Sequence, residues 1–343
     1  MAKLFKRKEV ETASMDAAEN AIANKEVEGL SQRQIVFKRF IHHRAAMVAL
    51  FSLFFITLIV YTSLDFKLGP WKIHGWWKYK VTDIPELRYK ECPGQVIGCP
   101  TLKLFPPSLG EHPFGQDDIG RDYLALVMRG AQRSLMVAFV IGLLGGVIGT
   151  IVGAISGFYR GVVDSVLMRL VDFVITVPAI IIGSVIGYRY GNLGAGFLAI
   201  YLGLFSWTGL SRLVRGEFLK LREMEFVDAA RVAGASNRRI IFKHILPNAV
   251  GIIIVSVTLL MSSAILLETA LSYIGFGVVA PDVSLGLLIS TYQDSFTSRP
   301  FLFWWPGFFI ISIALSINFI GDGLRDAFDP RQRRRVSRKE RGK

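Results

Sequence analysis

Residues 45–64 read AAMVALFSLFFITLIVYTSL, a run of twenty residues without a single charged side chain. A helix of about 20 apolar residues is long enough to cross the roughly 30 Å hydrocarbon core of a bilayer. Of the 343 residues in the chain, 52% are hydrophobic and only 20% are charged, and the charges cluster between such runs. A soluble domain carries about 25% charged residues. The composition therefore predicts a membrane protein.

Five further runs have the length and composition of membrane-spanning helices. The six predicted spans are residues 45–64, 134–158, 166–188, 193–214, 249–271 and 303–320. Pro178 lies inside the third run, where the missing N–H and the ring of proline predict a kink. Small residues recur on one face of the second run at Gly149, Gly153 and Gly157, which favours close helix packing. The expected fold is an all-α membrane protein with six transmembrane helices.

Lysine and arginine residues gather in three segments that fall on one side of a six-span topology. Nine lie in residues 1–44, eight in residues 212–243 and nine from residue 321 onward. Short cytoplasmic loops carry an excess of Lys and Arg, so we expect these segments and both termini to be cytoplasmic. The net charge of +13 is explained by this arrangement, and nucleic-acid binding is not expected.

This topology divides the chain into successive regions. They are a cytoplasmic tail at 1–44, a first transmembrane helix at 45–64, an external segment at 65–133, a five-helix core at 134–320 that includes a cytoplasmic loop at 215–248, and a basic cytoplasmic tail at 321–343. Cys92 and Cys99 both lie in the external segment. They could form a disulfide or remain two free thiols.

The stretch before the first span, SQRQIVFKRFIHHR at residues 31–44, has an amphipathic pattern. One helical face would carry Ile35, Val36, Phe40 and Ile41, and the other Arg33, Lys38, Arg39 and Arg44. Such a pattern is typical of a helix that lies in the membrane interface. A basic flank without fixed structure is the alternative.

The cytoplasmic loop between the fourth and fifth spans is far longer than an ordinary helix connection. We expect a helix from about residue 217 to 233, ended by Gly234, where a left-handed backbone is favourable for glycine. Ser236 can cap a second helix that ends near Leu246, directly before Pro247. The first helix would carry a small, partly apolar face made of Phe226, Ala229, Ala230 and Ala233. This face could seat in a partner's groove or pack beneath its own bundle, and both possibilities are open.

Three charged residues within the predicted spans are candidates for function. Arg169 and Asp172 fall near the start of the third span and could pair with each other, and Glu268 lies late in the fifth, where it could line an external vestibule. Charges at membrane depth are candidates for function, so these three are the candidate pore residues. The acidic cluster GQDDIGRD at residues 115–122 could bind a cation, but a helix cap before the second span is the favoured interpretation.

The sequence lacks the motifs that would indicate nucleotide binding, metalloprotease activity or a metal site. It has no G-x-x-x-x-G-K-[ST] phosphate loop and no H-E-x-x-H arrangement among its five histidines. No Cys/His group has metal-ligand spacing. We therefore expect no catalytic residue, no bound cofactor and no metal site.

The cytoplasmic loop resembles the EAA loop of ABC importer permeases. That pattern is Glu-Ala-Ala, three residues, Gly, nine residues, then Ile-x-Leu-Pro, and here it reads Asp228-Ala229-Ala230, Gly234 and finally His244-Ile245-Leu246-Pro247. Asp228 replaces the usual Glu and His244 the commonest Ile, while the spacing is intact. Residues 112–139, 268–289 and 318–331 are similar to the C-type permeases of oligopeptide, dipeptide and nickel importers, so that the resemblance covers roughly residues 33–331.

The resemblance implies a five-helix type I permease core preceded by one N-terminal span, in the inner membrane of a bacterium. The implied partners are a B-type permease subunit, two cytoplasmic ABC ATPase subunits that hold ATP and magnesium, an external peptide-binding protein and membrane lipid. The implied ATPase-coupling residues are Phe226, Asp228, Ala229, Ala230, Gly234, Leu246 and Pro247. Short peptides are the first expected substrate, and dipeptides or a nickel complex come next. A stand-alone channel or an ion-coupled carrier is the alternative function.

Overall fold

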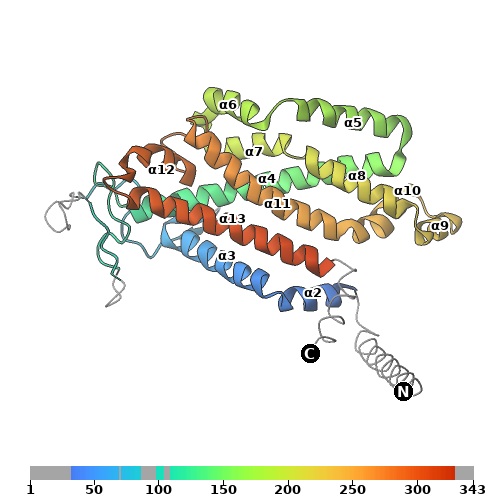
Figure 1. Ribbon diagram of the computed structural model, residues 1–343, viewed down its shortest axis with the longest axis horizontal. Helices are drawn as coiled ribbons and strands as arrows, with labels where there is room; N and C mark the ends of the chain where they lie inside the picture. The colour runs from blue at the N-terminus through green and yellow to red at the C-terminus, as the bar shows by residue number, and fades with distance from the viewer. Residues whose placement is uncertain (1–31, 69–70, 86–97, 104–108, 329–343) are drawn as a thin grey trace, which may run out of the picture.

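The computed structural model describes residues 32–68, 71–85, 98–103 and 109–328. The described helices are α2 (Gln32–His42), α3 (Arg44–Ser63), α4 (Tyr123–Tyr159), α5 (Gly161–Thr176), α6 (Ala179–Tyr190), α7 (Ala195–Phe205), α8 (Thr208–Arg222), α9 (Glu225–Val232), α10 (Asn237–Arg239), α11 (Leu246–Tyr273), α12 (Leu285–Tyr292) and α13 (Phe301–Phe328). The long helices run side by side along the longest axis of the molecule (Figure 1). We call the end that carries α9 and α10 the α9 end, and the opposite end the α12 end.

The six spans expected from the hydrophobic runs all have a counterpart. Five described segments are long and apolar enough to cross a membrane, namely α3, α4, α7 with α8, α10 through α11, and α13. The sixth counterpart is the pair α5 and α6, which meet the same criterion only when taken together and are bent by 68° at a short break; we call this pair the broken span. Pro178 lies at that break and precedes α6, so the expected kink is confirmed. The all-α membrane fold with six spans is confirmed.

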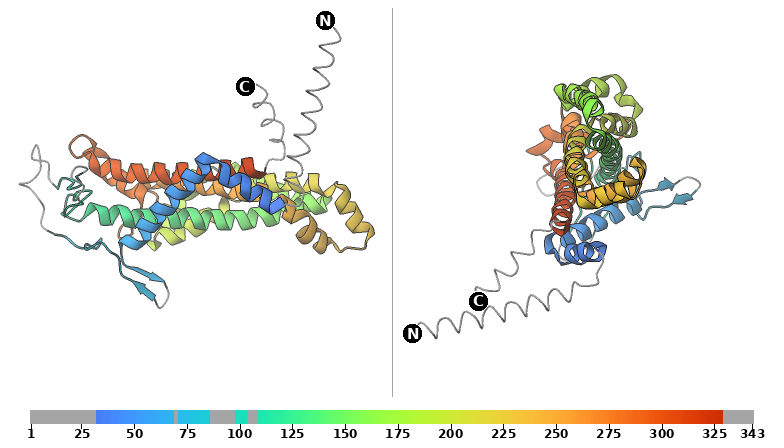
Figure 2. Two further views of the ribbon diagram at one scale, coloured as in Figure 1. Left: turned by 90° about the horizontal axis from the view of Figure 1, so that it is seen from below. Right: turned by 90° about the vertical axis from the view of Figure 1, so that its right-hand side faces the viewer.

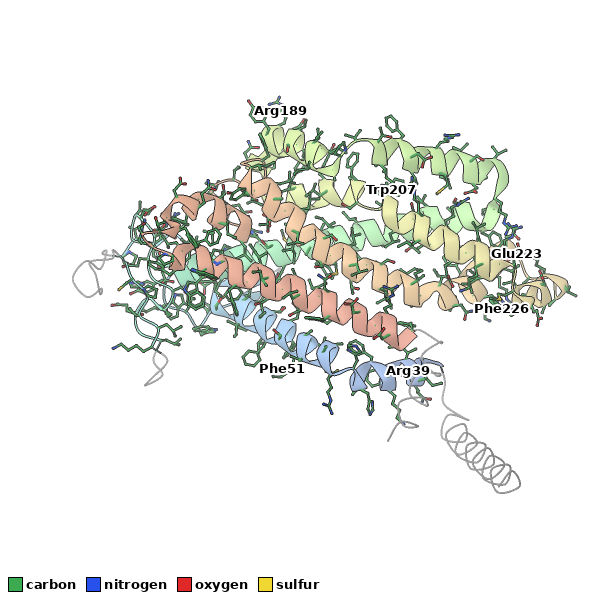
Figure 3. All side chains as sticks on the ribbon, in the orientation of Figure 1. Arg39, Phe51, Arg189, Trp207, Glu223 and Phe226 are labelled. Carbon is green, nitrogen blue, oxygen red and sulfur yellow. The ribbon has the colours of Figure 1, made fainter. Side chains whose placement is uncertain are left out.

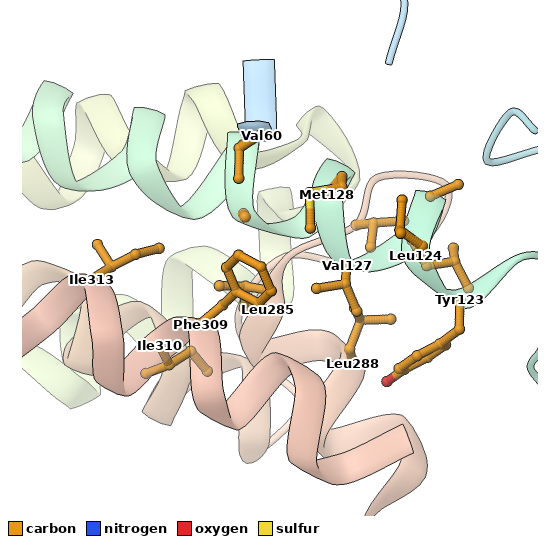
Figure 4. Packing of buried hydrophobic residues seen from close by; sticks show 14 of the residues in the cluster. Val60, Tyr123, Leu124, Val127, Met128, Leu285, Leu288, Phe309, Ile310 and Ile313 are labelled. Atoms are coloured by element: carbon orange, nitrogen blue, oxygen red, sulfur yellow. The ribbon is translucent and has the colours of Figure 1, made fainter. Parts of the chain in front are cut away.

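Helix α4 forms the centre of the bundle because it contributes to all three buried apolar clusters. Its first turns pack with α3, α12 and α13, and Figure 4 shows side chains of α4, α12 and α13 interleaved. Its middle packs against α7 and α11, and its last turns pack against α8. A helix of 37 residues is about 55 Å long, so α4 extends beyond the hydrocarbon core.

Close packing of α4 on α8 depends on the glycines of α4. A Cβ on Gly153 would lie 2.5 Å from the carbonyl oxygen of Ser211, and one on Gly157 would lie 2.7 Å from that of Arg215. These two helices therefore approach within backbone contact, as small residues at a spacing of four permit.

Several boundaries differ from those expected. Helix α4 begins at Tyr123, inside the expected external segment 65–133, because Asp122 caps it there. Helix α13 continues to Phe328, so its last turns occupy the start of the expected tail 321–343. The fourth span is interrupted around Ser206 and Trp207, where α7 ends and α8 begins (Figure 3). The rest of that tail and residues 1–31 lie outside the described residues.

The external segment adds a small antiparallel ribbon that the sequence reasoning did not anticipate. Strand β1 (Phe66–Leu68) pairs with β2 (Trp71–Ile73). The ribbon projects sideways from the helices (Figure 2). After it, the chain returns to the end of α3, where the backbone N–H of Trp77 donates to the carbonyl of Ser63 over 3.0 Å.

A helix, α2, is present over Gln32–His42 where the amphipathic helix is expected, and its location in the membrane interface stays a prediction. Ile35, Val36 and Phe40 are half-buried, whereas Ile41 is exposed. His43 separates α2 from α3 and caps α3 by accepting from the N–H of Ala46 over 3.1 Å. The same imidazole lies 3.4 Å from the Asp326 carboxylate, which joins this corner to the end of α13.

Candidate functional site

The loop between the fourth and fifth spans forms a short helix and a tight turn at the α9 end. Helix α8 continues without a break to Arg222, so the expected helix over 217–233 is wrong in its first part. The chain turns at Glu223 and Met224, and α9 then covers Glu225–Val232. Residues 217–233 are good helix formers throughout, so no residue type in the sequence marks this turn.

Gly234 ends α9 with the backbone conformation that its sequence position predicts. Its φ is +77°, in the left-handed region. The N–H of Gly234 donates to the carbonyl of Arg231 over 2.9 Å, and the N–H of Ala235 donates to that of Ala230 over 3.0 Å. These two bonds make a Schellman motif, which satisfies the last carbonyls of the helix and reverses the chain direction.

The second helical segment begins as expected and ends elsewhere. The hydroxyl of Ser236 caps it by accepting from the N–H of Arg239 over 3.4 Å. The segment then passes through a π-helical turn, Ile240–Ile245, and continues directly into α11. The expected end of this helix at Leu246 is therefore wrong. The π turn before Pro247 is wider than an α-helical turn, so the helix can continue although Pro247 has no N–H to donate.

The candidate coupling face of α9 divides between the interior and the surface. Val227 and Ala230 are buried against Ile240, Ile241 and Ile245 in the apolar cluster of the α9 end. Phe226 is 39% exposed and Val232 is 91% exposed, and Ala229 and Ala233 are also exposed. Ala230 therefore faces its own bundle, whereas Phe226, one turn before it on the same helix, is only partly covered. Leu246 is half-buried and Pro247 is exposed.

Asp228 and Phe226 lie on the solvent side of α9. The Asp228 carboxylate pairs with Arg231 Nη1 over 2.8 Å, one helical turn further along. Figure 3 shows Phe226 and Glu223 at the α9 end, far from Arg189 at the other end of the molecule. An exposed ion pair of this kind contributes little to stability, so these charges remain available to a partner.

Two arginine–carboxylate pairs connect the loop to the helices beneath it, and the sequence reasoning did not find them. Arg215 of α8 makes two bonds of 2.6 Å to the Asp164 carboxylate of α5. Arg160, between α4 and α5, pairs with Glu223 over 2.6 Å. The partners are 51 and 63 residues apart in sequence, since 215 − 164 is 51 and 223 − 160 is 63, so no local spacing could reveal them. The first pair holds α5 against α8, and the second joins the start of α5 to the turn that precedes α9.

The candidate pore residues are not brought together. Arg169 and Asp172 do not pair with each other, because Asp172 pairs with Arg212 of α8 over 2.6 Å. Arg169 and Asp172 are both exposed on α5. The expectation that they neutralise each other at a spacing of three is wrong, since the neighbouring helix supplies a closer guanidinium.

Glu268 is fully buried, so the expectation that it lines an external vestibule is wrong. Its carboxylate accepts from the hydroxyl of Ser134 on α4 over 3.1 Å and from that of Ser272 on α11 over 2.8 Å. The Ser134 oxygen in turn accepts from the N–H of Leu285 over 3.3 Å. Glu268 therefore connects α4, α11 and the first turn of α12.

The acidic cluster at 115–122 serves as a structural corner at the α12 end. Asp122 is the N-cap of α4, and its carboxylate accepts from Ala125 N–H over 2.8 Å and from Trp77 Nε1 over 2.9 Å. His112 Nδ1 lies 2.8 Å from the same carboxylate. Asp122 and His112 are both buried. The interpretation of this cluster as a helix cap is confirmed.

Asp117 holds the turn before that cap. It accepts from Arg121 Nε over 2.6 Å and from the phenol of Tyr292 over 3.2 Å. Burial, with the neighbouring Asp117 carboxylate, raises the pKa of the Tyr292 phenol. Within the described part of the chain, no group of three or more His, Cys, Asp or Glu residues could hold a metal ion. Cys99 is disulfide-bonded, and the other cysteine of the sequence, Cys92, lies outside the described residues.

Comparisons with known proteins identify the family. The model of the family described as "Binding-protein-dependent transport system inner membrane component" matches residues 149–334. The chain is 39% identical to the oligopeptide transport system permease protein OppC of Escherichia coli strain K12 over 93% of this chain and 97% of that protein. It is 36% identical to OppC of Mycobacterium tuberculosis strain H37Rv over 88% of this chain and 96% of the relative.

A solved structure supports the same fold at lower identity. A chain of the MetNI methionine ABC transporter, in an inward-facing form, superposes with a TM-score of 0.50 at 20% identity. The match covers 60% of this chain and 96% of that one. The chain therefore belongs to the family of binding-protein-dependent transport system inner membrane components. It is a multi-pass inner-membrane permease subunit of an ABC importer, of the OppC-like type.

Proposed function

We propose that this permease subunit carries short peptides across the cytoplasmic membrane of a bacterium. The relatives that match it over nearly their whole length are named as oligopeptide transport permeases, which supports peptides as the substrate class. An external peptide-binding protein would deliver the substrate, and a B-type permease subunit would complete the pore. The dipeptide and nickel-complex alternatives would use the same architecture, with most of the selection made by the binding protein.

The observation that carries the coupling role is the division of α9 between two faces. Val227 and Ala230 hold the helix on its own core, so that it is rigidly attached to the bundle. Phe226, Ala229 and Val232 are left exposed on a helix that projects at the α9 end (Figure 1). An exposed, partly apolar helical face is suited to a groove in a partner. Asp228 and Gly234 would orient this face, and Leu246 and Pro247 would transmit its movement to α11.

The proposed partner at this face is a cytoplasmic ABC ATPase, and a second ATPase would serve the other permease subunit. ATP and magnesium would be held by these ATPases, with no cofactor, metal or catalytic residue in this chain. Closure of the ATPases on ATP would move the attached α9 as a rigid body and switch the pore between its two states.

The α9 end is proposed to be cytoplasmic, together with both termini. The Lys and Arg residues of segments 1–44, 212–243 and 321–343 support this orientation. Arg169 and Asp172, exposed on the broken span, are proposed as pore candidates. Glu268 is not proposed as one, because it is buried within this subunit.

Copurification tests the proposed assembly. The chain is tagged in its own cells, extracted in mild detergent, and the bound proteins are identified by mass spectrometry. Recovery of a second permease and an ATPase is the expected result. A stable homo-oligomer without an ATPase, which transports a labelled peptide in vesicles without ATP, would favour the stand-alone channel or carrier instead.

A further inference from the structure

Two arginines lie on consecutive turns of α4, near the α12 end of the molecule. Arg129 and Arg133 are both half-buried, and we call them the arginine pair. Residues at this spacing lie on one helix face, with about 5–6 Å between their Cβ atoms. The pair stands just before residue 134, where the second span was expected to begin. It therefore lies at the edge of the membrane on the side that is proposed to be external.

Arg129 is held by an amide and not by a carboxylate. Its Nη1 donates to Oε1 of Gln132 over 3.1 Å, and Nε2 of the buried Gln132 donates to the carbonyl of Val60 on α3 over 2.8 Å. A guanidinium can only donate and a carbonyl can only accept, so the two contacts fix the orientation of the Gln132 amide. Within the described part of the chain, no carboxylate forms an ion pair with Arg129.

Arg133 has a carboxylate partner but uses only one of its donors for it. Its Nε donates to Oδ1 of Asp282 over 2.9 Å. Asp282 is also held by two backbone groups, because it accepts from the N–H of Ala195 at the start of α7 and from that of Val283, each over 3.1 Å. Among residues 32–68, 71–85, 98–103 and 109–328, no hydrogen bond or ion pair reaches the two Nη atoms of Arg133.

The arginine pair therefore carries one positive charge more than its surroundings balance. Two like charges one helical turn apart repel each other, and partial burial weakens the screening by salt. By contrast, Arg215 makes two bonds to Asp164, and Arg121 bonds to the buried Asp117. The pair leaves several guanidinium N–H donors free, and the planar fork of these donors matches the two oxygens of a carboxylate.

The same face of α4 continues from the pair toward the middle of the membrane. Met136 and Val140 follow on it and are half-buried, and Leu143 and Val147 come next, 53% and 49% exposed. These positions are three or four residues apart, which keeps them on one side of the helix. A solute that enters from the proposed external side along this face meets the arginine pair before it meets the apolar residues.

We infer that the arginine pair binds the C-terminal carboxylate of the transported peptide at the external mouth of the pathway. This inference rests on the proposed function of the subunit as a peptide permease. Short peptides differ in their side chains, but each one with a free C-terminus ends in a carboxylate. A site that recognises this group can hold peptides of any sequence in one direction, with Gln132 and Asp282 as the residues that position the two guanidinium groups.

Uptake of a peptide with and without its terminal charge tests the inference. Arg129→Gln is the variant of choice because it breaks no ion pair, and Lys80→Gln, at an exposed residue of the external segment, removes the same charge as a control. Cells take up a labelled tripeptide as the free acid or as the C-terminal amide, both well below saturation. We expect Arg129→Gln to lower uptake of the acid by about tenfold, as loss of a charge-assisted fork would, and to leave uptake of the amide unchanged.

The comparison isolates the permease because every strain contains the same binding protein. Any preference of the binding protein for the acid is present in wild type and in both variants, so it cancels from the change between them. Lys80→Gln is expected to leave uptake of both peptides at the wild-type level.

A photo-crosslink identifies the ligand directly. Met136, one turn past Arg133 on the same face, is replaced by p-benzoyl-phenylalanine in the assembled transporter in native membranes. Illumination in the presence of the binding protein and the tripeptide acid should attach the peptide, and mass spectrometry identifies the adduct. Adding Arg129→Gln should abolish the peptide adduct, whereas adding Lys80→Gln should leave it. This readout decides the matter even where the binding protein rejects the amide.

The outcomes separate this inference from the proposed function. An equal fall in uptake of acid and amide, or no fall in either, overturns the inference and leaves peptide import in place. An adduct with phospholipid alone, together with an unchanged ratio of acid to amide uptake, assigns the pair to a lipid phosphate and also overturns it. Failure of the wild-type transporter to import either peptide overturns the proposed function and the inference together.

Discussion

The two ends of this permease subunit use their charged residues in opposite ways. At the α12 end, Asp117, Asp122 and Glu268 are fully buried, and each accepts hydrogen bonds from two or more side chains or backbone N–H groups. At the α9 end, Asp228 and Arg239 are exposed. The interior there is filled by apolar side chains instead.

The α12 end uses its charged residues to fix the arrangement of its segments, whereas the α9 end exposes them to solvent. Buried carboxylates with several donors fix the directions of the segments that they join, because leaving any donor unsatisfied is unfavourable. The α12 end therefore has the construction of a fixed corner. The α9 end has a compact apolar base and exposed charges above it, which fits the docking surface proposed there. The following substitutions test this contrast, from the largest expected effect to the smallest.

Gly234→Val is expected to have the largest effect on transport. A β-branched residue at a φ of +77° is strained by about 1–2 kcal/mol, so the Schellman turn would open and α9 would lose its orientation. We expect peptide uptake to fall by at least about tenfold, which corresponds to roughly 1.4 kcal/mol of coupling free energy. Uptake of a labelled tripeptide by whole cells is the measurement.

Gly234→Asn is the matched control, because asparagine tolerates the left-handed region better than other side chains. It should retain much of the uptake, and both variants should reach the membrane in normal amounts. Equal loss of uptake in the two variants would show that the backbone conformation is not the reason.

Asp122→Ala is expected to destabilise the α12 end strongly. The buried N–H of Ala125, the indole of Trp77 and the imidazole of His112 would all lose their acceptor. Loss of one buried charged partner destabilises by about 3–5 kcal/mol. Thermal unfolding in detergent is the measurement. Asp118→Ala, four residues before it in the sequence, removes one ion pair in which the carboxylate itself is exposed, with Arg299, and should lower stability by only about 1 kcal/mol.

Gly153→Ala should destabilise the contact between α4 and α8 by about 1–3 kcal/mol, because its Cβ would lie 2.5 Å from a backbone carbonyl. Gly216→Ala is the matched change on α8, where a Cβ would meet nothing within 4 Å. It should raise stability by up to about 1 kcal/mol through helix propensity. Opposite signs for the two changes in thermal unfolding support the close approach, and equal signs contradict it.

Asp228→Ala should have the smallest effect on stability. Its pair with Arg231 lies on the surface at a helical spacing of three and contributes less than about 0.5 kcal/mol. A change in uptake without a change in unfolding temperature is therefore expected if the carboxylate meets the ATPase. A matching fall in unfolding temperature would instead assign Asp228 to the fold.

The sequence was sufficient to predict features that depend on local physics. Runs of apolar residues predicted the spans, and Pro178, Gly234 and Ser236 predicted a kink, a left-handed turn and a cap that are all present. These follow from the length of a hydrophobic run or from the conformational limits of one residue. The family pattern of the loop could also be found, because its residues are fixed in spacing.

Features that depend on tertiary neighbours could not be predicted. Asp172 pairs with Arg212, forty residues away (212 − 172 = 40), and not with the nearby Arg169. Ala230 and Ala229 are chemically identical, yet one is buried and the other exposed, because the position of the π turn decides which face of α9 is covered. Glu268 is a charged residue inside a predicted span, which made it a pore candidate. Only the tertiary structure shows that Ser134 and Ser272 donate hydrogen bonds to it within the subunit.

The most direct test of the coupling role is a photo-crosslink from α9 itself. Phe226 is replaced by p-benzoyl-phenylalanine, which keeps the ring of this exposed residue, and Phe51 on the outer face of α3 is replaced in the same way as a control (Figure 3). Illumination of native membranes should give an adduct of this chain with the ATPase from position 226 and none from position 51. An ATPase that copurifies with the chain but forms no adduct from position 226 would contradict the account.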